Sequence, residues 1–199
     1  MREFDLRGWL GVSLLVVGTS AFAAYEIEAG QRFAAGLDET EGFDLTWPGR
    51  SDVMLQGGVR QPRLAVPSVM SSLHALGDFN PVPLLEQEWR LQGRPVRHVV
   101  ADFAGAPVPL VVSDPRWMGL HKWWLSVKPE RDRLKKSKDA KQGDLLLCAV
   151  LDRIPGRYPM DTDFVMNLPA EWLPVFTQWA QPHQFIPGKS TPAWSALTP

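Results

Sequence analysis

The stretch Leu14-Leu15-Val16-Val17-Gly18-Thr19-Ser20-Ala21-Phe22-Ala23-Ala24-Tyr25-Glu26 decides the expected fold of this 199-residue chain. A short apolar run bounded by glycine predicts a strand over residues 13–17 that is buried on both faces. The residues that follow predict a helix from Ser20 to about Ala29, which stops at Gly30. Backbone N–H groups and the positive dipole end at a helix start suit a phosphate. Gly18, Thr19 and Ser20 are therefore candidate phosphate-contacting residues, with plain helix capping as the alternative.

A second strand is expected over residues 43–47, and it carries an acid. Asp44 and Thr46 share one face of this strand, and Phe43, Leu45 and Trp47 the other. Divalent cations such as Mg²⁺ prefer carboxylate oxygens, so Asp44 is a candidate metal ligand. Glu41 could join it only where residues 40–42 are irregular. The alternative is that Asp44 is an ordinary exposed strand acid.

Composition limits the classes of protein that fit. The formal net charge is −1, which gives no signal for nucleic-acid binding, and 45% of the residues are hydrophobic, enough for a sizeable core. The expected units are a core over residues 1–112, a helical subdomain over 113–181 and a Pro-rich tail over 182–199. Strands first and helices later predict an α+β fold with a small mixed sheet followed by a mainly helical C-terminal half.

The N-terminal residues allow a second interpretation, a secretory signal peptide. An apolar run precedes Ala21-Phe22-Ala23, which resembles a cleavage site. Glu3 and Asp5 are out of place in such a peptide, and a single cysteine provides no disulfide framework. The run is too short to span a bilayer. We expect a cytoplasmic protein with no membrane partner, and export remains the alternative.

Local signals predict the elements of the second half. Residues 96–100 and 108–112 read as a β-hairpin, and Asp114-Pro115 predicts a capped helix from Pro115 to about Val127. A charged stretch over residues 128–141 leads into an apolar helix that runs through Leu151. Further helices are expected over residues 67–76 and about 170–179.

Basic residues in this half form a second candidate cluster. On the helix over 115–127, Lys122 lies opposite the apolar stripe, where it faces either a cleft or water. Asp139 and Gln142 share a helical face, and Lys136 lies nearby in the sequence. Cations here could neutralise phosphate oxygens while Asp139 orients one of them; a solvated, salt-bridged helix start is the alternative. His121 is expected to pack or to cap, Cys148 to lie in the core, and the histidines show no zinc-ligand spacing.

Two blocks of the chain resemble a bacterial nucleotidyltransferase-fold family of the DNA polymerase β superfamily. The first block runs from Leu15-Val16-Val17-Gly18-Thr19 through Ala24-Tyr25-Glu26 to Thr40-Glu41-Gly42-Phe43-Asp44-Leu45-Thr46-Trp47. The second comprises Val111-Val112-Ser113-Asp114-Pro115-Arg116, Leu120-His121-Lys122-Trp123-Trp124-Leu125-Ser126, Arg131-Asp132 and Lys135-Lys136-Ser137-Lys138-Asp139-Ala140-Lys141-Gln142. Together they span roughly a third of the chain, and their combined order is more specific than either alone.

The resemblance implies a polymerase-β-like core that binds a nucleoside triphosphate with Mg²⁺ and transfers a nucleoside monophosphate to a protein, RNA or small-molecule acceptor. Gly18 and Thr19 match the phosphate-contacting pair, Asp44 the second metal-binding acid, and Lys122, Lys136 and Asp139 the helical half of the site. Gly42 stands where the family has its first acid, and Asp52, Asp78 and Asp102 are all open as a third. Two hypotheses follow: an enzyme in which Glu41 or another acid completes the cluster, or a non-catalytic nucleotide- or partner-binding module.

Overall fold

The computed structural model describes residues 5–11, 15–33, 44–46, 92–101 and 104–188. Its described strands form one four-stranded mixed sheet in the order β2-β1-β4-β3. The two central strands, β1 (Leu15–Val17) and β4 (Pro107–Val112), run parallel, with Val16 opposite Val112. The outer strands β2 (Asp44–Thr46) and β3 (Val96–Ala101) are antiparallel to their neighbours. This is a mixed α+β fold.

Each central strand leads directly toward a helix at the same edge of the sheet. After β1 comes a 3-10 turn, η1 (Thr19–Ala21), and then α2 (Phe22–Ala29), which ends at Gly30 in the left-handed conformation. After β4 comes α4 (Pro115–Val127), where Asp114 accepts a hydrogen bond from the Arg116 amide as the N-cap. Because β1 and β4 are parallel, both chain reversals lie at one edge.

The longest helix includes most of the charged stretch over residues 128–141, which was expected to precede it. α5 (Arg133–Arg153) is a single helix, and its start is capped by Asp132, which accepts from the amides of Leu134 and Lys135 at 3.0 and 3.1 Å. Its buried face begins at Asp139 and continues through Gln142, Gly143, Leu146, Leu147 and Val150 at helical spacing. After α5 follow α6 (Thr162–Met166), η3 (Ala170–Trp172) and α7 (Leu173–Ala180).

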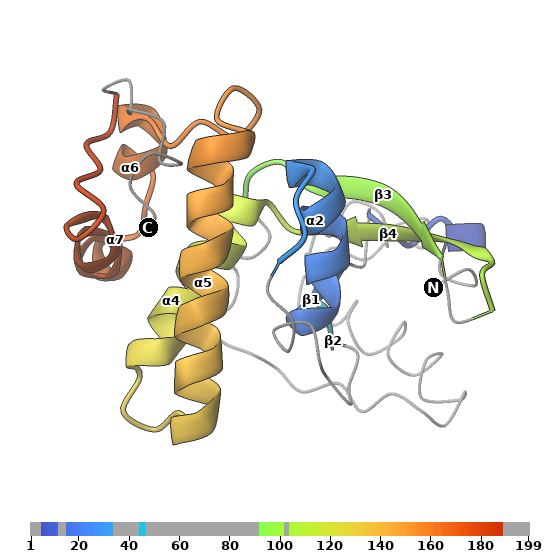
Figure 1. Ribbon diagram of the computed structural model, residues 1–199, viewed down its shortest axis with the longest axis horizontal. Helices are drawn as coiled ribbons and strands as arrows, with labels where there is room; N and C mark the ends of the chain where they lie inside the picture. Colours follow the sequence, from blue (N-terminus) through green and yellow to red (C-terminus); the bar gives the residue numbers. More distant parts are fainter. Residues whose placement is uncertain (1–4, 12–14, 34–43, 47–91, 102–103, 189–199) are drawn as a thin grey trace, which may run out of the picture.

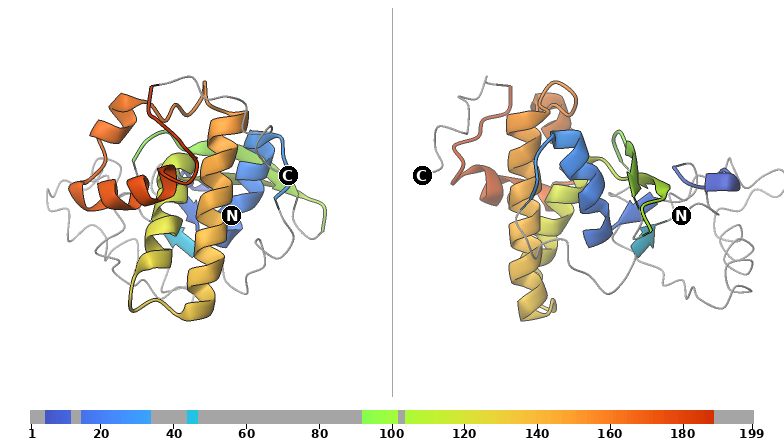
Figure 2. Two further views of the ribbon diagram at one scale, coloured as in Figure 1. Left: turned by 60° about the vertical axis from the view of Figure 1, so that its left-hand side comes forward. Right: turned by 45° about the vertical axis from the view of Figure 1, so that its right-hand side comes forward.

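The elements are arranged in successive layers. Figures 1 and 2 show α2 between the sheet and α5, α4 beside α5, and α6 with α7 on the side of the α4–α5 pair away from the sheet. One apolar core runs through these layers, from Val16 and Val112 in the sheet to Trp172 and Trp179 in the last helices. All four of these side chains are fully buried.

Glycines set the close approach of α4 and α5. A Cβ at Gly143 would lie 2.7 Å from the Trp123 amide nitrogen and 2.8 Å from the Gly119 carbonyl oxygen. Both are backbone atoms, so a larger residue at this position requires the helices to separate. The contact places the α4 residues around Lys122 against the α5 residues around Asp139.

The structure contains most of the local elements predicted for its described residues. The hairpin, the strand before Gly18, the end of the first helix at Gly30 and the Asp114-capped helix over 115–127 are confirmed. The expected direct strand-to-helix turn is wrong in one detail, because η1 intervenes before α2. The helix α6 was not anticipated. The helix expected over 67–76 and residues Glu41, Gly42, Asp52, Asp78 and Asp102 lie outside the described residues.

Candidate functional site

The chain turns sharply at Gly18, directly after the central strand. Gly18 has φ 71° and ψ −154°, a backbone conformation that residues with a Cβ rarely adopt. In the register of β1 and β2, Val17 lies opposite Asp44. The backbone of Asp44 is therefore beside the residue that precedes the turn. The side chain of Asp44 lies outside the described part, so its role as a metal ligand stays a prediction.

A buried glutamine joins this turn to α5. Gln142 is fully buried, and its Nε2 donates a hydrogen bond of 3.3 Å to Thr19 Oγ1. The two residues are 123 positions apart, one in each of the two blocks that carry the resemblance. Gly18 is the N-cap of η1 and has no side chain to cap it. The Thr19 hydroxyl accepts a hydrogen bond from α5.

Three charged residues form an ion-pair cluster one helical turn from Gln142. Lys122 Nζ donates to Asp139 Oδ1 at 2.9 Å, and Arg131 reaches Asp139 Oδ2 through Nε at 2.8 Å and Nη2 at 2.7 Å. The side chains of Lys122 and Asp139 are 8% and 3% exposed, and that of Arg131 is 32% exposed. Of the two settings expected for Lys122, a cleft or water, water is wrong: the side chain is buried where the glycine contact brings α4 against α5.

This cluster carries one net positive charge in a partly dehydrated place. Both carboxylate oxygens of Asp139 are engaged by cations, so the pair of positive groups exceeds the single negative one. Electrostatic interactions are stronger where water is excluded. Asp139 orients the two cations and is not available as a metal ligand.

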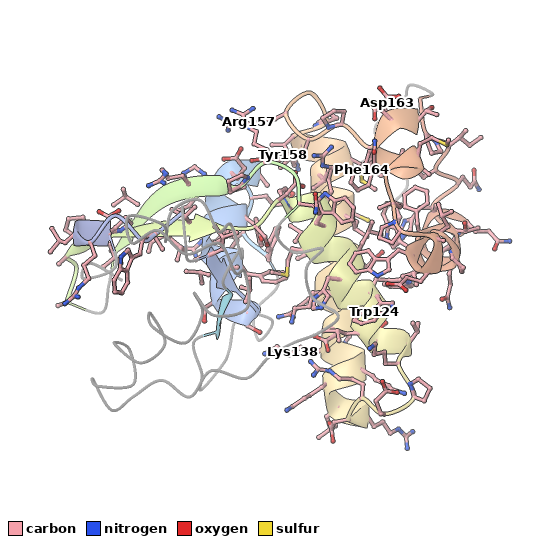
Figure 3. The ribbon with its side chains drawn as sticks, turned by 180° about the vertical axis from the view of Figure 1, so that it is seen from behind. Trp124, Lys138, Arg157, Tyr158, Asp163 and Phe164 are labelled. Carbon is pink, nitrogen blue, oxygen red and sulfur yellow. The ribbon has the colours of Figure 1, made fainter. Side chains whose placement is uncertain are left out.

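Two further predicted site residues, Lys136 and Ser20, lie in other places. Lys136 Nζ donates to the Pro129 carbonyl oxygen at 3.3 Å in the connection before α5 and is not part of the Lys122–Asp139 cluster. Ser20 is half-buried within η1, beside Thr19. Figure 3 shows Trp124 and Lys138 toward one end of the α4–α5 pair and Arg157, Tyr158 and Phe164 at the other.

His121 packs, as the sequence predicted. Its ring packs against those of Trp124 and Trp172, with centroid distances of 5.6 and 6.2 Å, and it is 2% exposed. Asp114, which is fully buried, is equally structural: besides its cap bond it accepts from the guanidinium of Arg116 and the amide of Arg94. Tyr25 of α2 donates to the Ser113 carbonyl oxygen at 2.9 Å and so links α2 to the connection between β4 and α4.

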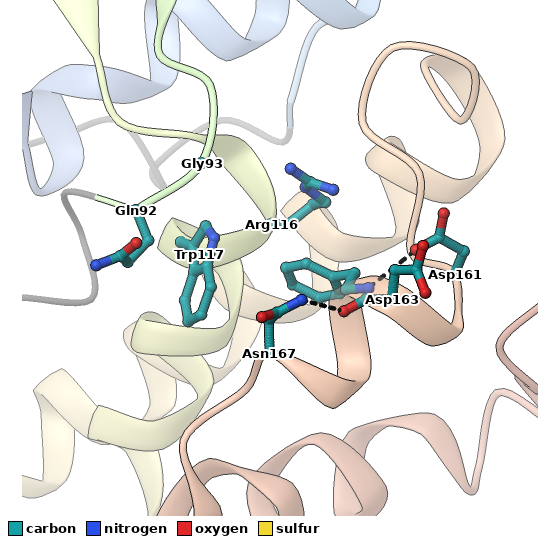
Figure 4. Close-up of a pocket in the computed structure, with 8 residues that line it drawn as sticks. Gln92, Gly93, Arg116, Trp117, Asp161, Asp163 and Asn167 are labelled. Atoms are coloured by element: carbon teal, nitrogen blue, oxygen red, sulfur yellow. Dashed lines mark hydrogen bonds between the residues drawn. The ribbon is translucent and has the colours of Figure 1, made fainter.

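A separate open pocket of about 470 Å³ lies at the other end of α4 (Figure 4). It is lined by Gln92, Gly93, Arg116, Trp117, Asp161, Asp163, Phe164 and Asn167. Its main polar groups have structural partners: Arg116 Nη1 donates to the Pro159 carbonyl oxygen, and Asp161 caps α6. The guanidinium of Arg116 also lies 4.7 Å from the ring centre of Phe164. These contacts make the pocket wall a packed part of the fold.

Sequence reasoning missed a cluster of Asp144, Cys148 and His183. Asp144 and Cys148 have i, i+4 spacing on α5, but His183 follows α7, and no local pattern connects it to them. The lone cysteine was expected to lie in the core; it is half-buried and lies beside polar groups. Burial and the Asp144 carboxylate raise the pKa of the Cys148 thiol from 9.0 to about 12.

The comparison with protein families agrees with the two sequence blocks. A family model described as Nucleotidyltransferase matches residues 1–72 and 67–161, which is most of the chain. The chain belongs to this nucleotidyltransferase family. The matches include the turn at Gly18, the Asp44 strand and the α4–α5 pair with its buried ion-pair cluster. No curated protein and no solved structure gives a significant match. Within the described residues, none of the helices combines the length and apolar character needed to cross a membrane.

Proposed function

We propose that this nucleotidyltransferase-family chain binds a nucleoside triphosphate at the Gly18-Thr19 turn and transfers its nucleoside monophosphate to an acceptor. The hydrogen bond between Gln142 and Thr19 is the observation that carries this proposal. It ties the turn that follows the central strand to the face of α5 that carries Asp139, and so brings a candidate phosphate turn near a net-positive cluster.

The basic cluster supplies charge for the triphosphate. Lys122 and Arg131 are held by Asp139 before any ligand arrives, which reduces the reorganisation needed when a phosphate binds. The net positive charge favours the negative triphosphate oxygens. In this arrangement Asp139 is a positioning residue, because its two oxygens contact Lys122 and Arg131. Lys136 lies outside the Lys122–Asp139 cluster, because its ammonium contacts the Pro129 carbonyl oxygen.

A divalent cation fits the placement of Asp44. Mg²⁺ is commonly held by one or two carboxylates together with substrate phosphates and water. The Asp44 backbone lies opposite Val17, directly before the turn, which suits one such carboxylate, and Glu41 is the nearest second acid in the sequence. When bound, the ion would neutralise charge on the triphosphate and on the leaving pyrophosphate. The acceptor is a hydroxyl of a protein, an RNA or a small molecule.

The test is binding and transfer of labelled nucleotide. Each of the four nucleoside triphosphates, labelled at the α-phosphate, is incubated with the protein and Mg²⁺, and binding and labelled products are measured. We expect Mg²⁺-dependent binding of at least one triphosphate and Mg²⁺-dependent label in a product. Asp44→Ala should lower the transfer by about 100-fold or more, the scale seen when one preorganised stabilising group is removed from an active site.

The matched control is Asp163→Asn, which removes an exposed acid on α6. Asp163 lies at the end of the α4–α5 pair away from Lys138 (Figure 3). This variant should retain binding and transfer. An Asp44→Ala protein that binds and transfers as well as the unaltered chain contradicts the proposed role of Asp44. Failure of all four triphosphates to bind, with or without Mg²⁺, contradicts the proposed function.

A further inference from the structure

Three side chains of metal-ligand type meet between α5 and the residues after α7. His183 Nε2 lies 2.7 Å from Asp144 Oδ1, and His183 Nδ1 lies 4.0 Å from Cys148 Sγ. Cys148 Sγ is also 3.9 Å from Asp144 Oδ1. One ligand atom from each residue lies within 4.8 Å of the other two. No other cluster of three such groups occurs among the described residues.

The fold holds these three residues in place from two elements. Asp144 and Cys148 are one helical turn apart on α5, so their side chains extend from the same face. His183 follows α7, whose Trp179 donates from Nε1 to Asp144 Oδ1 at 3.0 Å. The ring of His183 lies against that of Trp179, with centroids 5.0 Å apart, and Phe185 is buried just beyond it. The segment after α7 is thus packed against α5 at this point.

We propose that Asp144, Cys148 and His183 form a binding site for Zn²⁺ or a similar thiolate-binding transition metal. Thiolate, imidazole and carboxylate are the three ligand types of protein zinc sites, at metal–ligand distances of about 2.0–2.3 Å. Ligand atoms of such a tetrahedral site lie roughly 3.3–3.8 Å apart. One ligand atom from each residue already lies within 4.8 Å of the other two, so modest side-chain rotations bring the three atoms to that spacing. Water completes the coordination, and the ion joins the chain after α7 to α5.

The surroundings allow an ion to enter and select its type. The side chains of Asp144 and His183 are 41% and 22% exposed, so the cluster is open to solvent on one side. A carboxylate and a thiolate together balance the two positive charges of the ion. The sulfur and imidazole ligands favour Zn²⁺ or Co²⁺ over Mg²⁺, which prefers oxygen ligands alone. This site does not depend on the proposed nucleotide site.

Binding would displace the thiol proton. Metal ions bind the thiolate, so a protonated cysteine gives up its proton when the ion arrives. Burial and the Asp144 carboxylate raise the pKa of Cys148. The same raised pKa argues against a nucleophilic role for this cysteine, since nucleophilic thiols are activated by a lowered pKa. Zinc binding at pH 7 should release about one proton per ion.

The experiment is a titration of the full chain with Co²⁺ and Zn²⁺ chlorides, without nucleotide. Co²⁺ bound to a thiolate has a sulfur-to-metal charge-transfer band in the near ultraviolet. We expect this band to saturate at one ion per chain, to disappear when Zn²⁺ is added, and to be unaffected by Mg²⁺. Proton release is measured with a pH indicator in weakly buffered solution.

Variants distinguish a built site from surface binding. Cys148→Ser should abolish the charge-transfer band, and His183→Gln should weaken binding by at least about tenfold, the minimum cost of losing even an outer-shell partner. The matched control is His98→Gln, which removes a histidine paired with Glu28 at 2.7 Å without a thiol in its cluster. It should leave the band and the affinity unchanged. Circular dichroism confirms that each variant is folded.

Two results would overturn the proposal. One is the lack of a charge-transfer band in the folded, reduced protein at excess Co²⁺. The other is a band that persists in Cys148→Ser, or an affinity that falls in His98→Gln as much as in His183→Gln. In either case the cluster is a hydrogen-bonded contact between α5 and the chain after α7. Because nucleotide transfer is not measured, neither result bears on the proposed function.

Discussion

The buried pair of Lys122 and Asp139 provides a sharp test of how the second half of the molecule is held together. Asp139→Asn keeps the side-chain volume but removes the negative charge that both cations contact. Lys122, with a side chain only 8% exposed, then loses the carboxylate that its ammonium contacts between α4 and α5. Breaking one partner of a buried ion pair costs about 3–5 kcal/mol. We expect the free energy of unfolding to fall by that amount.

Urea and thermal denaturation followed by circular dichroism measure this loss. For a chain of this size each kcal/mol corresponds to about 2–4 °C, so Asp139→Asn should lower the melting temperature by roughly 6–20 °C. The double variant Lys122→Met, Asp139→Leu is the decisive control. Replacing a whole buried pair by apolar residues is often neutral or stabilising, so this variant should recover most of the loss.

Arg131→Gln separates the two cations of the cluster. Its side chain is 32% exposed and its charge is screened by water, so we expect the free energy of unfolding to fall by at most about 1 kcal/mol.

A fall of less than about 0.5 kcal/mol in Asp139→Asn, within the range of an ordinary surface substitution, would refute the argument that Lys122 depends on this carboxylate. A double variant less stable than Asp139→Asn would contradict the explanation by an unpaired charge.

Two further predictions concern α5. Gly143→Ala should lower the free energy of unfolding by about 1–3 kcal/mol, because the new Cβ meets backbone atoms of α4 at 2.7–2.8 Å, although helix propensity alone favours alanine by about 1 kcal/mol. Gly156→Ala, where a Cβ meets no atom within 4 Å, is its control in the same urea titration. Because the pKa of Cys148 is raised from 9.0 to about 12 on folding, its protonated thiol contributes stability below about pH 9 that is lost as the pH rises toward 12. Metal-free Cys148→Ala should therefore show a shallower decline in stability over this range, and an equally steep decline would contradict the assigned pKa.

Elements with short-range signals were predicted well. Pro115 at the first helical position and Asp114 as a cap start α4 at its observed residue, and Gly30 ends α2 in a left-handed conformation. The hairpin over β3 and β4 also follows from alternating β-rich runs around a glycine. In each case the hydrogen bonds and steric limits involve residues a few positions apart, so a local pattern is sufficient to specify the element.

The residues of the candidate site were predicted from the sequence, but the contacts between them were not. Gly18, Thr19, Asp139 and Gln142 were each identified from local spacing, and the family match agrees with the blocks that contain them. The contact between Thr19 and Gln142 spans 123 positions and depends on how α5 packs beside the sheet. Periodicity shows which face of a helix is buried, but not which residue of another element meets it.

Short-range patterns thus predicted several of the local elements and a resemblance to the family that the family match shows. Packing established the burial of Lys122 against Asp139, the strand order that puts β1 beside β4, and the meeting of Cys148 with His183. The physical reason is range: capping, turn geometry and alternation act within a few residues. By contrast, the charge environment of a side chain depends on groups brought close only when the whole core forms. Lys122 is the clearest case, because helical spacing placed it opposite the apolar stripe and the close contact of Gly143 with α4 buried it.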